Sequence, residues 1–138
     1  MASYVKYQKG VEALVEGINA GSDTWKIALS NTAPNVSTNA TLSDATEISA
    51  GNGYTAGGNT AAISSSTQTG GTYKLVLSSP ATWTATGGSI GPLRYAILYD
   101  STTDNLVGYW DYGSSITLNA GDSFTVNLDG TNGVFQVA

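Results

Sequence analysis

Five aspartates in the last third of the sequence are the first candidates for chemistry. Paired carboxylates act as acid and nucleophile in glycosidases, and clustered carboxylates bind Ca²⁺. Four of the five occupy predicted turns, where an aspartate bonds its own backbone, and their spacing is not that of a Ca²⁺-binding loop. The pattern therefore indicates turns rather than a catalytic or metal site for Asp100, Asp104, Asp111, Asp122 and Asp129.

Nucleophilic and metal chemistry is further limited because the sequence contains neither His nor Cys. Ser–His and Cys–His pairs, disulfides and most zinc sites all require one of these residues. The glycine clusters lack the Lys-Ser/Thr pair of a phosphate-binding loop and do not follow G-x-G-x-x-G spacing. We therefore expect a protein that is not an enzyme and that uses no cofactor or metal.

Aromatic residues are the remaining candidates for ligand binding. Tyr109, Trp110 and Tyr112, together with Trp83, would form a stacking platform for a sugar if their rings were exposed. Trp110 and Tyr112 share a predicted strand face with Tyr95, however, which favours a place in the core. Tyr109 lies on the opposite predicted face and is the better candidate for contact with a partner.

Composition indicates a single domain over the 138 residues, with a surface that carries little charge. Only 11% of the residues are charged, the net charge is −5, and the five basic residues are scattered. A chain without a basic patch is not expected to bind nucleic acid or an anionic membrane. The start of the chain lacks the apolar core of a signal peptide, and no segment approaches about 18 continuous apolar residues. We expect a protein made in the cytoplasm that does not span a membrane.

Secondary structure is predicted to be almost entirely β. The N-terminal segment, residues 1–21, is the exception, since helical spacing relates Val11, Leu14, Val15 and Ile18. Alternating apolar residues predict strands at 24–29, 72–77, 81–85, 93–99, 106–112 and 134–137, and a half-solvated hairpin over 115–128. The Gly/Ser-rich segment 49–71 is predicted to be a long exposed loop or arm, with at most a short strand at 60–64. The chain should fold as an antiparallel β-sandwich, with a jelly roll as a candidate topology.

A hairpin of residues 93–99 and 106–112 has the most specific predicted register. A loop through 101–104 would pair Tyr99 with Leu106 and Leu98 with Val107. The same register places Arg94 opposite Asp111 as a stabilising ion pair. Both faces of the hairpin are largely apolar, so one must be covered by something beyond its own core.

Three blocks of sequence resemble a family of small virion proteins of tailed bacteriophages. The blocks are EISAGNGYTAGG at 47–58, GSIGPLRYAILYD at 88–100 and LVGYWDYG at 106–113, and the similarity extends from about Trp25 to the C-terminus. Members of this family tend to be encoded near the major capsid protein. The resemblance therefore implies a head decoration, or cement, protein and brings no catalytic motif.

Such a role implies specific partners and a location. A cement protein clamps capsid subunits by burying surface, often as an oligomer that matches the local symmetry. We expect binding to the major capsid protein on the capsid exterior, and self-association as a trimer. The residues predicted to form contacts are Tyr4, Tyr7, Asn52, Tyr54, Asn59, Leu98, Val107 and Tyr109.

Two other functions fit the same sequence. A tail or fibre component that recognises a host-surface glycan would present exposed coplanar aromatic rings and bind sugar weakly. A small secreted carbohydrate-binding module is the third reading, and the missing signal peptide argues against it.

Overall fold

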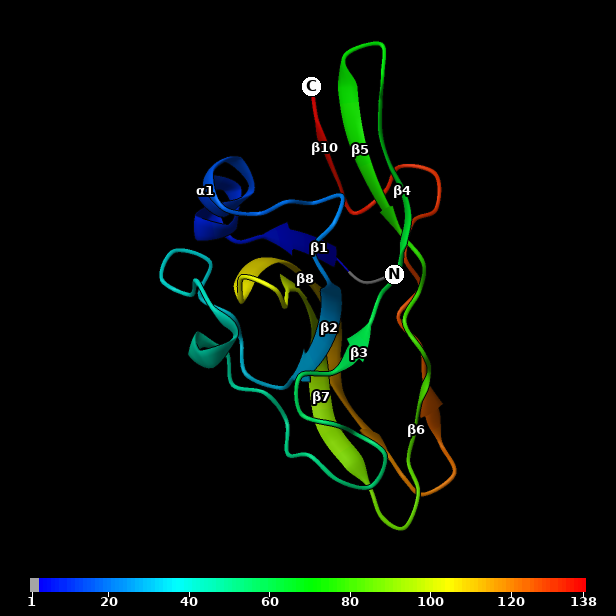
Figure 1. Cartoon of the computed structure of the whole chain (residues 1–138). Helices are drawn as coiled ribbons and strands as arrows, with labels where there is room; N and C mark the ends of the chain where they lie inside the picture. The colour runs from blue at the N-terminus through cyan, green and yellow to red at the C-terminus, as the bar shows by residue number, and fades with distance from the viewer. Residues whose placement is uncertain (1–2) are drawn as a thin grey trace.

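An antiparallel sheet of five strands, in the order β1-β8-β7-β2-β3, is the larger layer of the computed structural model, which describes residues 3–138 (Figure 1). Residues 1 and 2 of the predicted N-terminal segment lie outside the described residues. The elements in chain order are β1 (Ser3–Lys6), α1 (Gln8–Glu16), β2 (Trp25–Ser30), the 3₁₀ turn η1 (Leu42–Asp44), β3 (Asn59–Thr60), β4 (Ile63–Thr69), β5 (Thr72–Leu77), β6 (Trp83–Thr84), β7 (Ile90–Asp100), β8 (Asn105–Leu118), β9 (Ser123–Phe124) and β10 (Phe135–Val137).

The second layer consists of two small sheets that together cover one face of the five-stranded sheet. Strands β10, β5 and β4 form one of them, and β6 pairs with β9 to form the other. Figure 1 shows the two small sheets one above the other along the same side of the molecule. The main core lies between the layers, so the chain is an all-β sandwich, as the sequence predicts.

Strands β2 and β5 form where strict alternation predicts them, because their apolar residues all reach this core. Trp25, Ile27 and Leu29 of β2 are buried there, and Leu75 and Leu77 of β5 face them from the second layer. Each strand therefore has one continuous apolar face, which is the condition that makes a strand's register specific.

A third layer covers the other face of the five-stranded sheet. Residues 31–48, which include η1, lie on this side in Figure 1. They pack Val36, Leu42 and Ala45 over a second buried cluster, formed by Tyr7, Ala28, Ile97, Tyr99 and Leu106. The doubly apolar hairpin is therefore covered twice by its own chain, and no partner is needed to bury its second face.

The β7–β8 hairpin follows the predicted register only at its turn. Tyr99 pairs with Leu106 as predicted, but Leu98 pairs with Gly108 instead of Val107. The register shifts between these two pairs, as it does when a bulge adds one residue to one strand. From Leu98 to Tyr95 each predicted pair is displaced by one residue, and Trp110 faces the same way as Leu98 rather than Tyr95.

The predicted N-terminal helix is present as α1 and packs on β8. Gly10 allows the close approach, since a Cβ there would lie 2.5 Å from the carbonyl oxygen of Leu106. Leu14 and Ile18 pack against the core, whereas Val11 and Val15 point away from it. The helical spacing was therefore predicted correctly, but only half of the apolar stripe is buried.

Two further predictions need correction. The segment 49–71 contains the two-residue strand β3 and the longer strand β4, so it is not a structureless arm. Strands β4 and β5 project as a hairpin, shown in green at the top of Figure 1. Residues 115–128 do not form a hairpin, because β9 pairs with β6 rather than with β8. The chain crosses between the two layers at 119–122, where the sequence shows only a turn.

Candidate functional site

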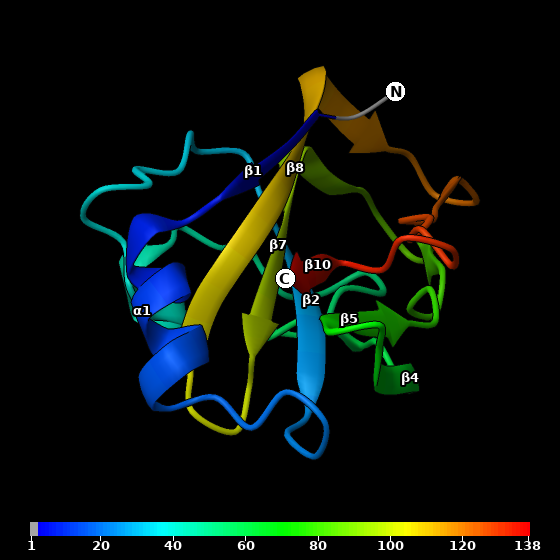
Figure 2. The ribbon, with the colours of Figure 1, turned by 90° about the horizontal axis from the view of Figure 1, so that it is seen from above.

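An open groove lies at one side of the sandwich. It has a volume of about 690 Å³ and lies between the β1–β8 edge and the segment 125–134. Figure 2 shows this edge on one side and the orange-to-red 125–134 segment on the other. We call this feature the aromatic groove; its lining residues are Tyr4, Trp110, Tyr112, Thr125, Asn127, Leu128, Asp129, Gly133 and Val134.

Strand β1 brings Tyr4 into the groove by pairing with β8. Tyr4 lies opposite Trp110, and their ring centroids are 5.1 Å apart with an interplanar angle of 55°. The hydroxyl end of the Tyr4 ring lies over Gly108, where an added Cβ would be 2.2 Å from the Tyr4 oxygen. A glycine at this point of β8 is therefore what allows the ring to lie against the sheet while 40% of the residue stays exposed.

Tyr112 completes the aromatic wall from the same face of β8. Its ring packs edge-on against Phe124 of β9, with a centroid separation of 5.1 Å. Trp110 and Tyr112 are half-buried and contact the main core, so each ring has one side packed and one side toward the groove. Of the four aromatic residues considered for a sugar platform, these two reach the groove; Trp83 is buried in the core and Tyr109 lies on the other face of the sheet.

The groove is electrically neutral apart from one carboxylate. Burial raises the pKa of Tyr4 to about 12, so its hydroxyl is uncharged at neutral pH. Asp129 is ionised, since hydrogen bonds from Asn132 and Thr131 lower the pKa of its carboxyl group. These bonds hold the carboxylate in its own turn, with both backbone N–H donors at 2.8 Å from Oδ1.

Four of the predicted contact residues cannot contact a partner because they are buried in this chain. Tyr7 and Leu98 are fully buried, Tyr54 is 2% exposed and Val107 is 3% exposed. The prediction failed because this chain covers both faces of the sheet: Leu98, Tyr54 and Val107 face the main core between the layers, and residues 31–48 cover Tyr7 on the other face.

The other predicted contact residues differ in their exposure. Tyr109 is half-buried, with its ring edge-on to Tyr7 at 5.6 Å. The side-chain amides of Asn52 and Asn59 donate to Ser89 and Ala81 carbonyl oxygens at 3.0 and 2.7 Å. These two amides hold the 51–59 loop in place, which leaves Tyr4 as the predicted residue that lines the groove.

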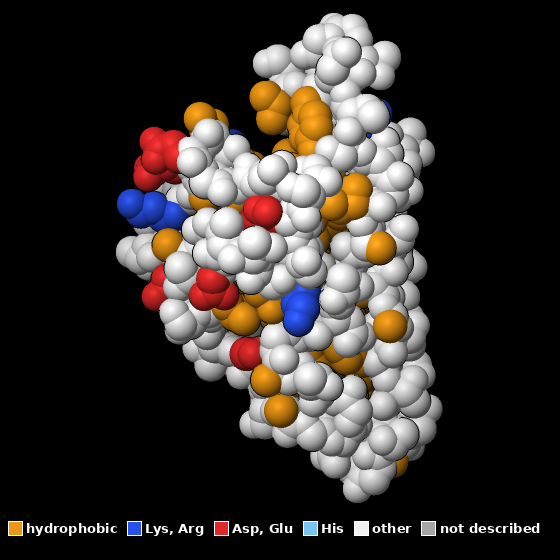
Figure 3. Space-filling model, viewed as in Figure 1, with side chains coloured by type: hydrophobic (Ala, Val, Ile, Leu, Met, Phe, Trp, Pro, Cys, Tyr) orange, Lys and Arg blue, Asp and Glu red, His pale blue; other side chains and the backbone are white. Residues whose placement is uncertain are grey.

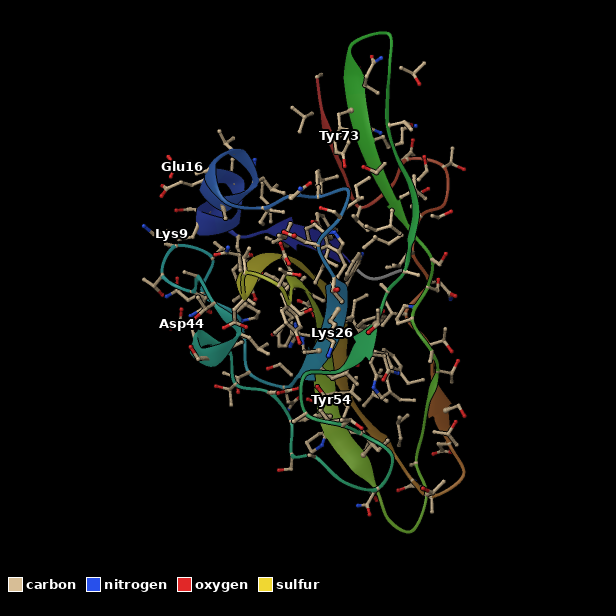
Figure 4. The ribbon with its side chains drawn as sticks, viewed as in Figure 1. Lys9, Glu16, Lys26, Asp44, Tyr54 and Tyr73 are labelled. Atoms are coloured by element: carbon tan, nitrogen blue, oxygen red, sulfur yellow. The ribbon has the colours of Figure 1, made fainter. Side chains whose placement is uncertain are left out.

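The glycine-rich block at 47–58 is a structural clip. Glu47 accepts hydrogen bonds from the hydroxyl of Tyr54 and from the backbone N–H of Gly57. The Tyr54 oxygen in turn accepts the backbone N–H of Leu29 in β2 at 3.0 Å. Figure 4 shows Tyr54 beside β7, beneath the loop that it anchors. The block therefore fastens a loop to the sheet, and its glycines let the backbone approach closely.

The predicted ion pair forms even though the register differs. Arg94 Nε lies 2.8 Å from Asp111 Oδ1, and the second nitrogen completes a bidentate contact at 3.2 Å. Asp111 lies opposite Tyr95 in the sheet, so the arginine reaches it diagonally. The Arg94 guanidinium also lies 5.3 Å from the centre of the Tyr95 ring, which is within range of a cation–π contact.

One of the five aspartates departs from the turn interpretation. Asp100 is fully buried at the end of β7, and its Oδ1 accepts the backbone N–H of Thr102 at 2.8 Å. Its Oδ2 has no hydrogen-bond donor among residues 3–138 and faces the carboxyl group of Asp23. Burial and the neighbouring Asp23 raise the pKa of Asp100 to about 6. This pair is the most perturbed acidic site in the described chain.

Comparisons with protein-family models, curated proteins and solved structures found no match for this chain. Within residues 3–138, no group of three or more acidic side chains could hold a metal ion, and no helix has the length and hydropathy to cross a membrane.

Proposed function

We propose that this chain is a non-enzymatic structural protein of a tailed-phage virion, which decorates the outside of the head and stabilises the lattice of the major capsid protein. The sequence blocks at 47–58, 88–100 and 106–113 support the virion class by their resemblance to that family. The observation that supports a contact with the capsid is the concentration of exposed apolar side chains in the first described elements, β1 and α1.

The N-terminal apolar surface consists of Val5 on β1 and Val11 and Val15 on α1; Tyr4, which precedes Val5 in β1, points to the opposite face and lines the aromatic groove. Val11 and Val15 are one helical turn apart and are 45% and 84% exposed, and Val5 is 36% exposed. Single exposed apolar residues are common, but a cluster on two consecutive elements is typical of an interaction surface. Among the residues described, the other large apolar side chains of comparable exposure are Tyr4 of the groove at 40% and Val137 at 55%.

The surrounding surface fits a contact that needs few charges. Charged residues make up 11% of the chain, and Figure 3 shows those of this face gathered mainly over α1 and residues 31–48. On α1, Lys9 and Glu16 project away from the sheet (Figure 4). A capsid surface would therefore meet an apolar centre with a sparse charged rim, which is the usual anatomy of a protein interface.

The decisive experiment counts this protein in purified virions of the phage that encodes it. Quantitative mass spectrometry should find on the order of hundreds of copies per particle, and cryo-electron microscopy should place them on the head lattice, as trimers at its local three-fold positions. A handful of copies at the tail tip would overturn the proposal in favour of the tail or fibre reading.

A pair of matched variants tests the contact surface itself. Val15→Asp adds a charge to the N-terminal apolar surface, whereas Val137→Asp adds the same charge to another exposed valine on β10. Heads that lack the protein should bind the Val137 variant as well as the native chain, and should bind the Val15 variant at least about tenfold more weakly. Equal binding of both variants would show that residues 5–15 are not the contact.

A further inference from the structure

The aromatic groove holds hydrogen-bonding groups without protein partners. The indole N–H of Trp110, the hydroxyl of Tyr112 and the side-chain amide of Asn127 form no hydrogen bond with any residue from 3 to 138. Together they offer both donors and acceptors, and all three are uncharged. They lie beside aromatic and aliphatic surface from Tyr4, Leu128 and Val134, so polar and apolar recognition elements share one groove.

The charge of the groove limits the class of ligand. Among its described lining residues there is no Lys or Arg, and nearby Lys74 donates to the carbonyl oxygen of Thr131, so a phosphate or carboxylate ligand would find no lining cation and would meet Asp129. A purely apolar ligand would bury the indole N–H and the amide without partners, which is unfavourable. A suitable ligand is therefore neutral, carries many hydroxyl groups and has one apolar face.

A pyranose sugar has this combination of properties. Its axial C–H groups form an apolar face that packs on an aromatic ring, and its rim of hydroxyl groups both donates and accepts hydrogen bonds. The groove volume of about 690 Å³ lies within the usual range for small-molecule sites. The rings of Tyr4 and Trp110 are inclined at 55°, so they would contact successive sugar units rather than one flat ring.

We propose that the aromatic groove binds a neutral oligosaccharide of at least two pyranose units, stacked on Tyr4 and Trp110 and hydrogen-bonded to Asn127. Tyr112 and Thr125 lie along the same groove, although the Thr125 hydroxyl is already engaged with Thr82 at 2.6 Å. The proposal uses a surface distinct from Val11 and Val15, and it does not depend on where in a virion the protein lies.

The test is a titration of the ¹⁵N-labelled full chain with maltotriose, cellotriose, mannotriose and N-acetylated chitotriose, followed by NMR. The three tryptophan indole signals give an internal comparison, since Trp25 and Trp83 are 1% exposed and Trp110 lines the groove. At least one sugar should shift the Trp110 signal saturably, with a Kd on the order of 1 mM, and leave the other two unchanged. No shift of Trp110 with any of the four sugars up to about 50 mM would overturn the proposal.

Two substitutions separate binding from folding. Asn127→Ala removes an exposed side chain without a protein hydrogen bond, so the fold should persist while affinity falls at least about fivefold. Tyr109→Ala removes an aromatic residue on the other face of the sheet and should leave affinity unchanged. Unchanged affinity in Asn127→Ala, or binding of a polyproline peptide at this groove in preference to all four sugars, would refute the sugar assignment.

Discussion

The buried carboxyl group of Asp100, beside half-buried Asp23, makes the stability of the fold depend on pH in an unusual direction. Asp100 is fully buried, and burial and Asp23 raise its pKa from 3.8 to about 6. The folded chain therefore holds a proton on Asp100 between these pH values, whereas the unfolded chain does not. The resulting stability is fully present below about pH 4 and is lost as the pH rises through about 6, by about 3 kcal/mol in total.

Asp100→Asn tests this reasoning because the amide cannot ionise. Its oxygen can still accept the backbone N–H of Thr102, and its NH₂ group can donate to Asp23 in place of the shared proton. The variant should match the native chain within about 1 kcal/mol near pH 4 and exceed it by up to about 3 kcal/mol near pH 8. Urea unfolding at several pH values, followed by tryptophan fluorescence, measures the difference.

The comparison between variant and native chain removes the contributions of the other acids. Asp44, Asp111 and Asp129 have lowered pKa values and act in the opposite direction, but they are present in both proteins. Asp104→Asn is the matched control, since Asp104 is exposed and its φ of 65° suits asparagine. A difference for Asp100→Asn that is independent of pH, or a variant less stable than the native chain near pH 8, would refute the shared proton.

Three further substitutions probe the close contacts of the fold. Gly58→Ala should lower the free energy of unfolding in urea by more than about 3 kcal/mol, because the added Cβ would lie 1.8 Å from a β2 carbonyl oxygen. Gly121→Ala is the control: its φ is also positive but the space around it is open, so it should lower the free energy of unfolding by only about 1 kcal/mol. Gly108→Ala should push the Tyr4 ring off β8, which should shift the NMR signals of the groove residues and lower the free energy of unfolding by about 1–2 kcal/mol. A structure of the variant with Tyr4 unmoved would contradict this prediction. Arg94→Met should leave the urea midpoint nearly unchanged, since the ion pair is solvent-exposed, and a large loss would show that the pair is structural.

Local sequence patterns predict those helices and strands whose formation depends mainly on the spacing of their own apolar residues. Strands β2 and β5 have one apolar face each, and α1 has apolar residues at helical spacing, so pattern and structure agree. The bulge in β8 could not be predicted this way. It adds one residue, so that Trp110 faces the main core while Tyr109 faces the second cluster, and that choice depends on what covers each face of the sheet.

The predicted contact surface is buried because this chain covers both faces of the five-stranded sheet: the main core between the layers holds Leu98 and Val107, and residues 31–48 cover Tyr7. Residues 31–48 read as a polar loop with only a few apolar positions, and three of these, Val36, Leu42 and Ala45, are enough to seal the second face of the sheet. A few side chains suffice because Tyr7, Ile97 and Tyr99 already fill most of the space beneath them. Sequence patterning shows that a face needs cover, but it does not show which segment covers it.

The sequence points to only some of the residues that line the aromatic groove, for a related reason. Trp110 and Tyr112 are recognisable as aromatic candidates, but their partner Tyr4 is more than 100 positions away in the sequence and joins them only through β1–β8 pairing. Asn127 was assigned to a hairpin that does not form, since β9 pairs with β6. The one available signal was Gly108, a glycine inside a strand, which often marks close approach by another group.

The most recognisable blocks of this sequence therefore build the fold rather than the recognition surfaces. Glu47 and Tyr54 of the first block form a buried clip, and the strand in the second block is buried over most of its length. The third block contributes Trp110 and Tyr112 to the groove but otherwise lies in the sheet. The exposed groups available for recognition lie mostly outside the blocks, in residues 4–15 and 125–129. The blocks therefore account for much of the architecture of this chain, whereas the exposed groups that could contact another molecule come mostly from the two other segments.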